Sequence, residues 1–130
     1  MIRISFKTAK LACEKGYKAG CDKCYTAQGK YLWPPYYGNS FKNGDDNGDC
    51  MYEAPYQAEL QEWLRDEHKI HIVVIQTNLP MTEPQTDQWE WGFDVVRVDD
   101  PNKSLCLKMG YETYESALEV GLYEALNIIK

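Results

Sequence analysis

Two cysteines in the amino-terminal third have the spacing of a metal or redox motif. Cys21 and Cys24 form a C-x-x-C pair, and Cys13 and Cys50 complete a candidate set of four zinc ligands. Structural zinc sites are marked best by two such pairs. Because neither Cys13 nor Cys50 belongs to a second pair, the sequence favours free thiols in a loop. The alternatives are a zinc site and a thioredoxin-like redox motif.

The only two histidines, His68 and His71, are three positions apart. A helix is predicted to end at the first and a strand to contain the second, so the geometry of a metal-binding helix face is lost. We expect His68 to complement the carboxyl end of the helix dipole. We expect His71 to lie on the less buried face of its strand, and a catalytic histidine is the alternative.

Residues 43–49 alternate Asn, Asp and Gly, which is the chemistry of turns. Counted from Asn43, the sixth position is Gly48, as a calcium-binding loop requires. The twelfth position is Ala54, where that loop needs a bidentate Glu. The segment therefore predicts a solvated turn.

Aromatic residues are abundant, with ten Tyr, four Trp and three Phe. Trp33, Tyr36 and Tyr37 cluster around two prolines that stiffen the segment. Rigid aromatic side chains lose little entropy on binding and dominate interface hot spots. We predict these three as protein-binding residues, with burial in the core as the alternative. Trp89 and Trp91 share one strand face, where we expect core positions.

The net charge of −6 argues against non-specific binding to nucleic acid, which depends on Lys and Arg at phosphates. Residues 3–30 are a local exception, with seven Lys or Arg against two acidic residues. A zinc-stabilised module that contacts nucleic acid through this segment is therefore an alternative function.

No apolar run reaches the roughly 18 residues that span a bilayer, and the first ten residues lack the apolar core of a signal peptide. We expect a cytoplasmic protein without a membrane partner, whose five cysteines are thiols.

The pattern along the chain predicts helices at 6–17, 55–67 and 114–129 and strands at 70–76, 89–98 and 105–109, with a turn at 99–102. Ser5, Pro55 and Thr113 suit the three helix starts. A short strand is expected within 25–32. This order predicts an α+β fold: a three-stranded, mostly antiparallel sheet, two or three helices packed on it, and a long irregular loop at about 18–54. We expect one domain over residues 1–130.

The last helix carries the clearest amphipathic pattern of the chain. Gly121 lies on its apolar stripe, where it would let the helix backbone approach the sheet closely. The stripe consists of Ala117, Leu118, Gly121, Leu122, Ala125, Leu126 and Ile129.

Three groups of residues are similar to one family. They are 5–12 with 15–17; 52–57 with 60, 63–65 and 68–72; and 114–122 with 124–126. Together they resemble small phage and prophage proteins of gut bacteria that have no assigned function. The resemblance implies a mobile-element origin and a setting in the host cytoplasm, and it supplies no catalytic residues.

The chain has no recognisable catalytic or phosphate-binding motif. We therefore predict a non-enzymatic accessory protein that binds an unknown protein partner and needs no cofactor. Beside the zinc-stabilised module, an enzyme of unknown class is a further alternative. Homo-oligomerisation through strand edges also stays open.

Overall fold

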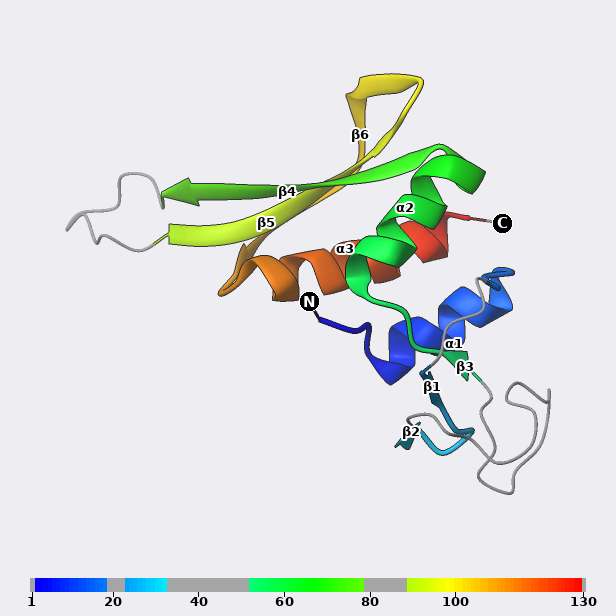
Figure 1. Cartoon of the computed structure of the whole chain (residues 1–130). Coiled ribbons are helices and arrows are strands. Elements are labelled where there is room, and N and C mark those ends of the chain that lie inside the picture. Colours follow the sequence, from blue (N-terminus) through cyan, green and yellow to red (C-terminus); the bar gives the residue numbers. More distant parts are fainter. Residues whose placement is uncertain (1, 19–22, 33–51, 79–88, 130) are drawn as a thin grey trace. The chain divides into compact units, whose positions relative to one another are not determined.

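Alternating apolar residues predict a strand with two distinct faces at 70–76, and the computed structural model of the chain contains this strand (Figure 1). The structure describes residues 2–18, 23–32, 52–78 and 89–129. Their contacts form two compact units, the first up to Leu60 and the second from Gln61 to Ile129.

The second unit is built on an antiparallel sheet in the order β4-β5-β6. Its strands are β4 (Ile70–Asn78), β5 (Trp89–Arg97) and β6 (Asp100–Tyr111). In the register, Ile72 pairs with Val95 and Val74 with Phe93, so these four side chains share one face. The predicted α+β class and the three-stranded antiparallel sheet are confirmed.

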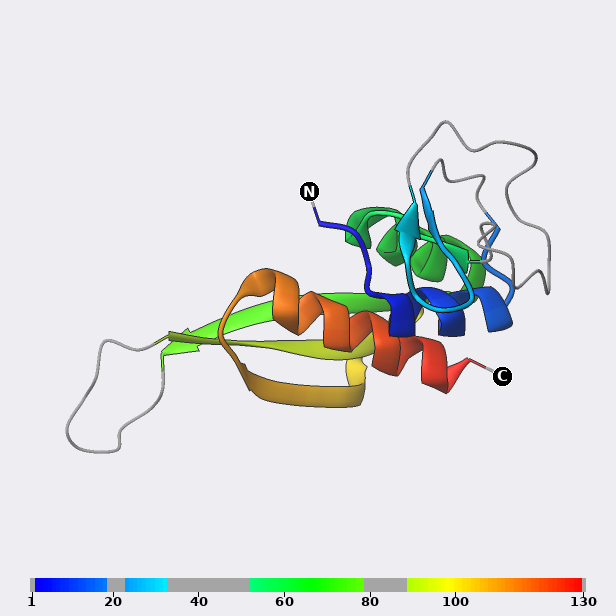
Figure 2. The same ribbon diagram turned by 90° about the horizontal axis from the view of Figure 1, so that it is seen from below.

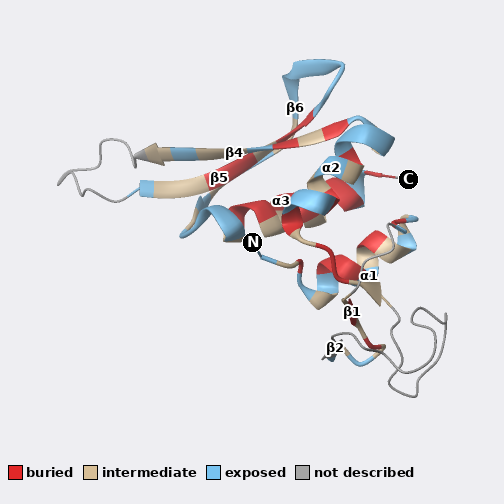
Figure 3. Ribbon diagram, in the orientation of Figure 1, coloured by how far each residue is buried: buried red, intermediate tan, exposed pale blue. Residues whose placement is uncertain are grey.

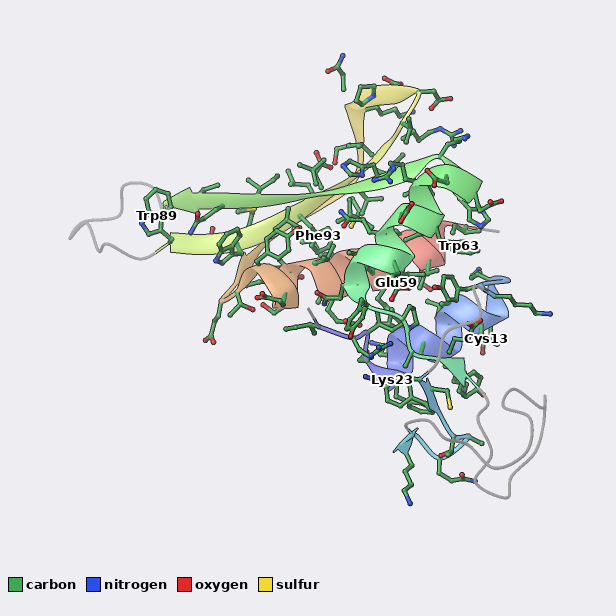
Figure 4. All side chains as sticks on the ribbon, viewed as in Figure 1. Cys13, Lys23, Glu59, Trp63, Trp89 and Phe93 are labelled. Atoms are coloured by element: carbon green, nitrogen blue, oxygen red, sulfur yellow. The ribbon has the colours of Figure 1, made fainter. Side chains whose placement is uncertain are left out.

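Helix α3 (Tyr114–Ile128) covers this face of the sheet (Figures 1 and 2). Phe93 and Val95 are fully buried, and Figure 4 shows Phe93 between the sheet and the helix. Every residue of the predicted apolar stripe is buried, which confirms the amphipathic pattern. The hydroxyl of Thr113 accepts the N–H of Ser116 at 3.0 Å, so the predicted cap is also confirmed.

The turn between β5 and β6 is tighter than the sequence predicts. We expected a turn at 99–102 and a strand at 105–109, but β5 ends at Arg97 and β6 already begins at Asp100. Arg97 and Asp100 pair directly across two turn residues, and the register then shifts before Val96 pairs with Ser104. The acceptor-rich residues that suggested a turn therefore begin a longer strand.

A second irregularity accompanies the other end of β6. Met109 pairs with Gly92 and Tyr111 with Trp91, so Gly110 is an extra residue in β6. Its φ of 101° is a conformation that glycine adopts without strain. The resulting bulge leads directly to the start of α3.

Helix α2 (Gln57–His68) begins two residues later than predicted. Pro55 does not occupy its first turn, because the carbonyl of Pro55 accepts the N–H of Ile4 at 3.1 Å as part of a bridge to the N-terminal segment. Further along α2, the side-chain amide of Gln61 donates to the carbonyl of Ile72 at 2.8 Å, which satisfies one polar group of strand β4.

The first unit contains α1 (Phe6–Glu14) and a small sheet in the order β2-β1-β3. The helix is capped by Ser5, as predicted, and Gly16 follows it with a φ of 98°. It ends three residues before the expected position, because its carboxyl-terminal turn already closes at Lys15.

The small sheet is formed by β1 (Cys24–Tyr25), β2 (Tyr31–Leu32) and β3 (Tyr52–Glu53). The ring of Phe6 packs edge-on against Tyr25 and Tyr52, at centroid distances of 5.7 and 5.8 Å. The sequence predicted a single short strand in an irregular loop here. The described parts of that loop instead contain three short strands, in which Tyr25 of β1 pairs with Tyr31 of β2 and Tyr52 of β3.

Burial separates the middle of the larger sheet from its ends. In Figure 3 the middle of β5 is buried, whereas its outer end is exposed.

Within the described ranges, the structure has no helix that is both long and apolar enough to cross a membrane.

Candidate protein-docking surface

The predicted binding residues Trp33, Tyr36 and Tyr37 lie outside the described residues, as do Cys21 and Cys50. Their roles stay predictions. The part of the chain that the structure describes contains the remaining candidates and a further group of aromatic residues.

Cys13 and Cys24 occupy different chemical states. Cys13 is a half-buried free thiol on α1, and its pKa is raised by burial first and by the carboxylate of Glu53 second. Cys24 is buried in β1 and is disulfide-bonded. The expectation that all five cysteines are thiols is therefore wrong for Cys24, whose sulfur is not available as a zinc thiolate in this state. Among the described residues, no three His, Cys, Asp or Glu side chains group closely enough to hold a metal ion.

The two histidines have different surroundings. The ring of His68 packs edge-on against Trp63 at 4.6 Å, near the end of α2. His71 is half-buried on β4, on the sheet face opposite α3, as the strand alternation predicts. Its Nδ1 atom is buried and has no hydrogen-bond partner within the described residues.

Four aromatic side chains gather where the larger sheet meets the start of α3. We call Trp89, Trp91, Tyr111 and Tyr114 the aromatic patch. Trp91 pairs with Tyr111 across β5 and β6, and its ring packs edge-on against Tyr114 at 5.7 Å. Trp89, the first residue of β5, lies two positions before Trp91 and on the same face.

Trp89 is 55% exposed and Tyr114 is 42% exposed. The expectation of a core position is therefore wrong for Trp89. The reason is that the sheet extends beyond the start of α3, so the helix covers Phe93 but does not reach the end of β5 (Figures 2 and 4). Trp91, between the two, is half-buried.

The surroundings of the aromatic patch are acidic. Residues 61–129 contain thirteen Asp or Glu and only five Lys or Arg. The residues that flank the rings in sequence include Glu112 and Glu115, whereas Glu90 lies on the opposite face of β5. Lys108 pairs with Phe93, two rows from the Trp91–Tyr111 pair. Its Nζ atom lies 3.2 Å from Oε1 of Glu124, which forms an ion pair with it. Aromatic faces and carboxylates both attract cationic side chains.

The sequence contained a signal for this surface that our prediction did not use. Trp89 and Trp91 alternate on one strand face, and Tyr111 and Tyr114 flank the cap of the following helix. Two aromatic pairs at the ends of consecutive elements indicate a cluster at their junction. How much of that cluster the helix covers depends on tertiary packing.

The chain matches no family model, and neither a curated protein nor a solved structure shows significant similarity to it. The resemblance to phage proteins therefore stays a prediction, and the function is inferred from the geometry of the chain.

Proposed function

We propose that this chain is a non-enzymatic protein-binding module that docks a positively charged segment of another protein on the aromatic patch. The observation that carries the proposal is the 55% exposure of Trp89 beside a supported group of rings. A mobile-element origin, as the sequence resemblance implies, is part of the same proposal.

The geometry of the rings suits recognition. Trp91 is held by its cross-strand neighbour Tyr111 and by the edge-on contact with Tyr114. Such fixed rings lose little conformational entropy when a partner covers them. Trp and Tyr are also the residue types that most often dominate the free energy of protein association.

The charge of the second unit favours a basic partner. Its acidic excess raises the association rate of a positively charged segment and disfavours an acidic one. A Lys or Arg of the partner contacts the exposed face of the Trp89 ring, and the acidic excess of the unit attracts its charge. The surface therefore offers an apolar contact and also prefers a positively charged partner over a negatively charged one.

Site-specific photo-crosslinking tests the proposal. Trp89 of the full chain is replaced by benzoyl-phenylalanine in the native host, and the irradiated product is identified by mass spectrometry. The matched control carries the same photoreactive residue at Val98, which is 46% exposed in the β5–β6 turn, away from the patch.

We expect a discrete crosslinked protein from position 89 and a much weaker product from position 98. The crosslinked peptide should contain Lys or Arg. Equal products at both positions, or an acidic crosslinked segment, would contradict the proposal.

A further inference from the structure

The middle rows of the sheet face opposite α3 are largely apolar, whereas α3 covers the other face. We call the patch formed by Val73, Ile75, Asp94, Ser104, Leu107 and Met109 the open face. The same sheet face also carries His71 and the buried Val96 in the row of Ser104, and Thr77 and Glu90 at its other end. An antiparallel sheet that has one solvated face normally carries polar side chains there. Leu107 is 56% exposed and Val73 40% exposed, so apolar area is left in water on both outer strands.

The carboxylate of Asp94 lies in the middle of this surface. In the register, Val73 pairs with Asp94, and Asp94 pairs with Leu107, so the three form one row across the sheet. The hydroxyl of Ser104 donates to Oδ1 of Asp94 at 2.5 Å. This hydrogen bond orients the carboxylate and leaves its other oxygen for a further donor.

The next row is flattened by a glycine. Ile75 pairs with Gly92, which pairs with Met109. A β carbon at position 92 would meet the Sδ atom of Met109, so the methionine side chain lies across the position that a larger residue would fill. The open face is therefore a shallow surface, with an adaptable Met at its side and a fixed charge at its centre.

The charge argues against a second copy of the chain as the occupant. An isologous contact between two open faces would bring two Asp94 carboxylates toward each other, with no Lys or Arg among the six residues of the surface to offset them. A carboxylate between exposed apolar side chains is instead complementary to a cation between apolar side chains.

We infer that the open face is a second docking surface, and that it binds a peptide segment in which Lys or Arg is flanked by apolar residues. The cation pairs with Asp94, and the apolar neighbours cover Val73 and Leu107. This inference does not depend on the aromatic patch, since the two surfaces lie on opposite faces of the sheet.

Selection from a random peptide library tests this inference. The library is displayed against the full chain and against four variants, Asp94→Asn, Leu107→Ser, Trp89→Ala and Val98→Ser. Val98→Ser is the matched control, because Val98 is a similarly exposed apolar residue outside the open face. Urea unfolding of each variant reports whether the fold is kept.

The expected result is a peptide class with Lys or Arg between apolar residues. Its affinity should fall about tenfold or more with Asp94→Asn and with Leu107→Ser. It should be unchanged with Trp89→Ala and Val98→Ser. A separate class that is lost only with Trp89→Ala would belong to the aromatic patch.

Two outcomes would overturn the inference. One is a selection in which no peptide class depends on Asp94 and Leu107. The other is a dimer, seen by analytical ultracentrifugation, that Leu107→Ser dissociates and Asp94→Asn strengthens. That second result would identify another copy of the chain as the occupant of the open face.

Discussion

Gly121 of α3 lies directly against Phe93 of β5. A β carbon at Gly121 would be 3.1 Å from Cγ of Phe93 and 2.8 Å from Cγ2 of Ile72. The absence of a side chain at this position therefore sets how closely the helix approaches the sheet, and Phe93 and Ile72 are almost completely buried as a result.

We expect Gly121→Ala to destabilise the fold despite the better helix propensity of alanine. The propensity gain is about 1 kcal/mol, while overpacking against two buried side chains costs about 1–3 kcal/mol. Urea unfolding should show a net loss of about 1 kcal/mol. Asn127→Ala, at an exposed position of the same helix, should change the free energy of unfolding by less than about 0.5 kcal/mol. A more stable Gly121→Ala variant would show that the helix can withdraw from the sheet without cost.

Gly92 also allows a close approach, here between β5 and the backbone of β6 on the sheet face opposite α3. A β carbon there would approach the carbonyl oxygen of Lys108 to 2.5 Å and also meet Met109. We expect Gly92→Ala to lower the free energy of unfolding by about 1–3 kcal/mol. Because the carbonyl remains, the added mutation Met109→Ala should not restore stability. Full recovery in the double variant would assign the whole effect to the methionine side chain.

Thr113 and Ser116 close the amino-terminal end of α3 reciprocally. The Thr113 hydroxyl accepts the N–H of Ser116, and the Ser116 hydroxyl lies 3.2 Å from the N–H of Thr113. Thr113→Ala should destabilise the chain by about 1 kcal/mol, whereas Thr113→Ser, which keeps the hydroxyl, should retain most of the stability. Thermal melting of the two variants measures the difference, and equal melting temperatures would show that the cap contributes nothing.

Cys13 and Cys106, the free thiols among the described residues, should react slowly with iodoacetamide in the folded chain. Burial raises the pKa of both Cys13 and Cys106, and nearby carboxylates, Glu53 and Glu124 respectively, raise it further. At pH 8 each therefore holds less thiolate in the folded state than after unfolding in urea, where alkylation should be faster.

The same shifts have a consequence for stability. A thiol whose pKa is raised by folding favours the folded state fully only below its ordinary pKa, and that contribution is lost as the pH rises through the raised value. Stability should therefore decline in this alkaline range, and replacing both residues by Ser should reduce the decline. Alkylation as fast in the folded chain as in urea would contradict the assignment of raised pKa values.

Regular elements of this fold follow closely from the sequence. The alternation of Ile70, Ile72 and Val74, the stripe of α3 and the caps at Ser5 and Thr113 are local patterns, and the structure reproduces each of them. Local patterns are sufficient there because one buried face or one side-chain hydrogen bond defines the element.

Features that depend on distant residues were missed. Pro55 resembles a helix start, but its carbonyl is engaged by Ile4 from a remote part of the chain. Asp100 resembles a turn residue, but it pairs with Arg97 in an extended strand. Ile4 is remote from Pro55 in sequence. Arg97 is only three residues from Asp100, but their pairing depends on the register of the whole β5–β6 pair.

The candidate site was predicted least well. Trp89 has the alternation of a core residue, and only the relative lengths of β5 and α3 leave it exposed. The disulfide at Cys24 also depends on which cysteines the fold brings together. Both are properties of tertiary structure that residue type alone does not determine.

The most direct test is calorimetric titration of the partner segment identified by crosslinking at position 89 into the wild-type chain and into Trp89→Ala. Because Trp89 is exposed and the fold does not depend on it, the variant should keep its free energy of unfolding within about 0.5 kcal/mol. Its affinity should nevertheless fall by about 2 kcal/mol or more, which is roughly thirtyfold. An unchanged affinity in a folded Trp89→Ala variant would contradict the account.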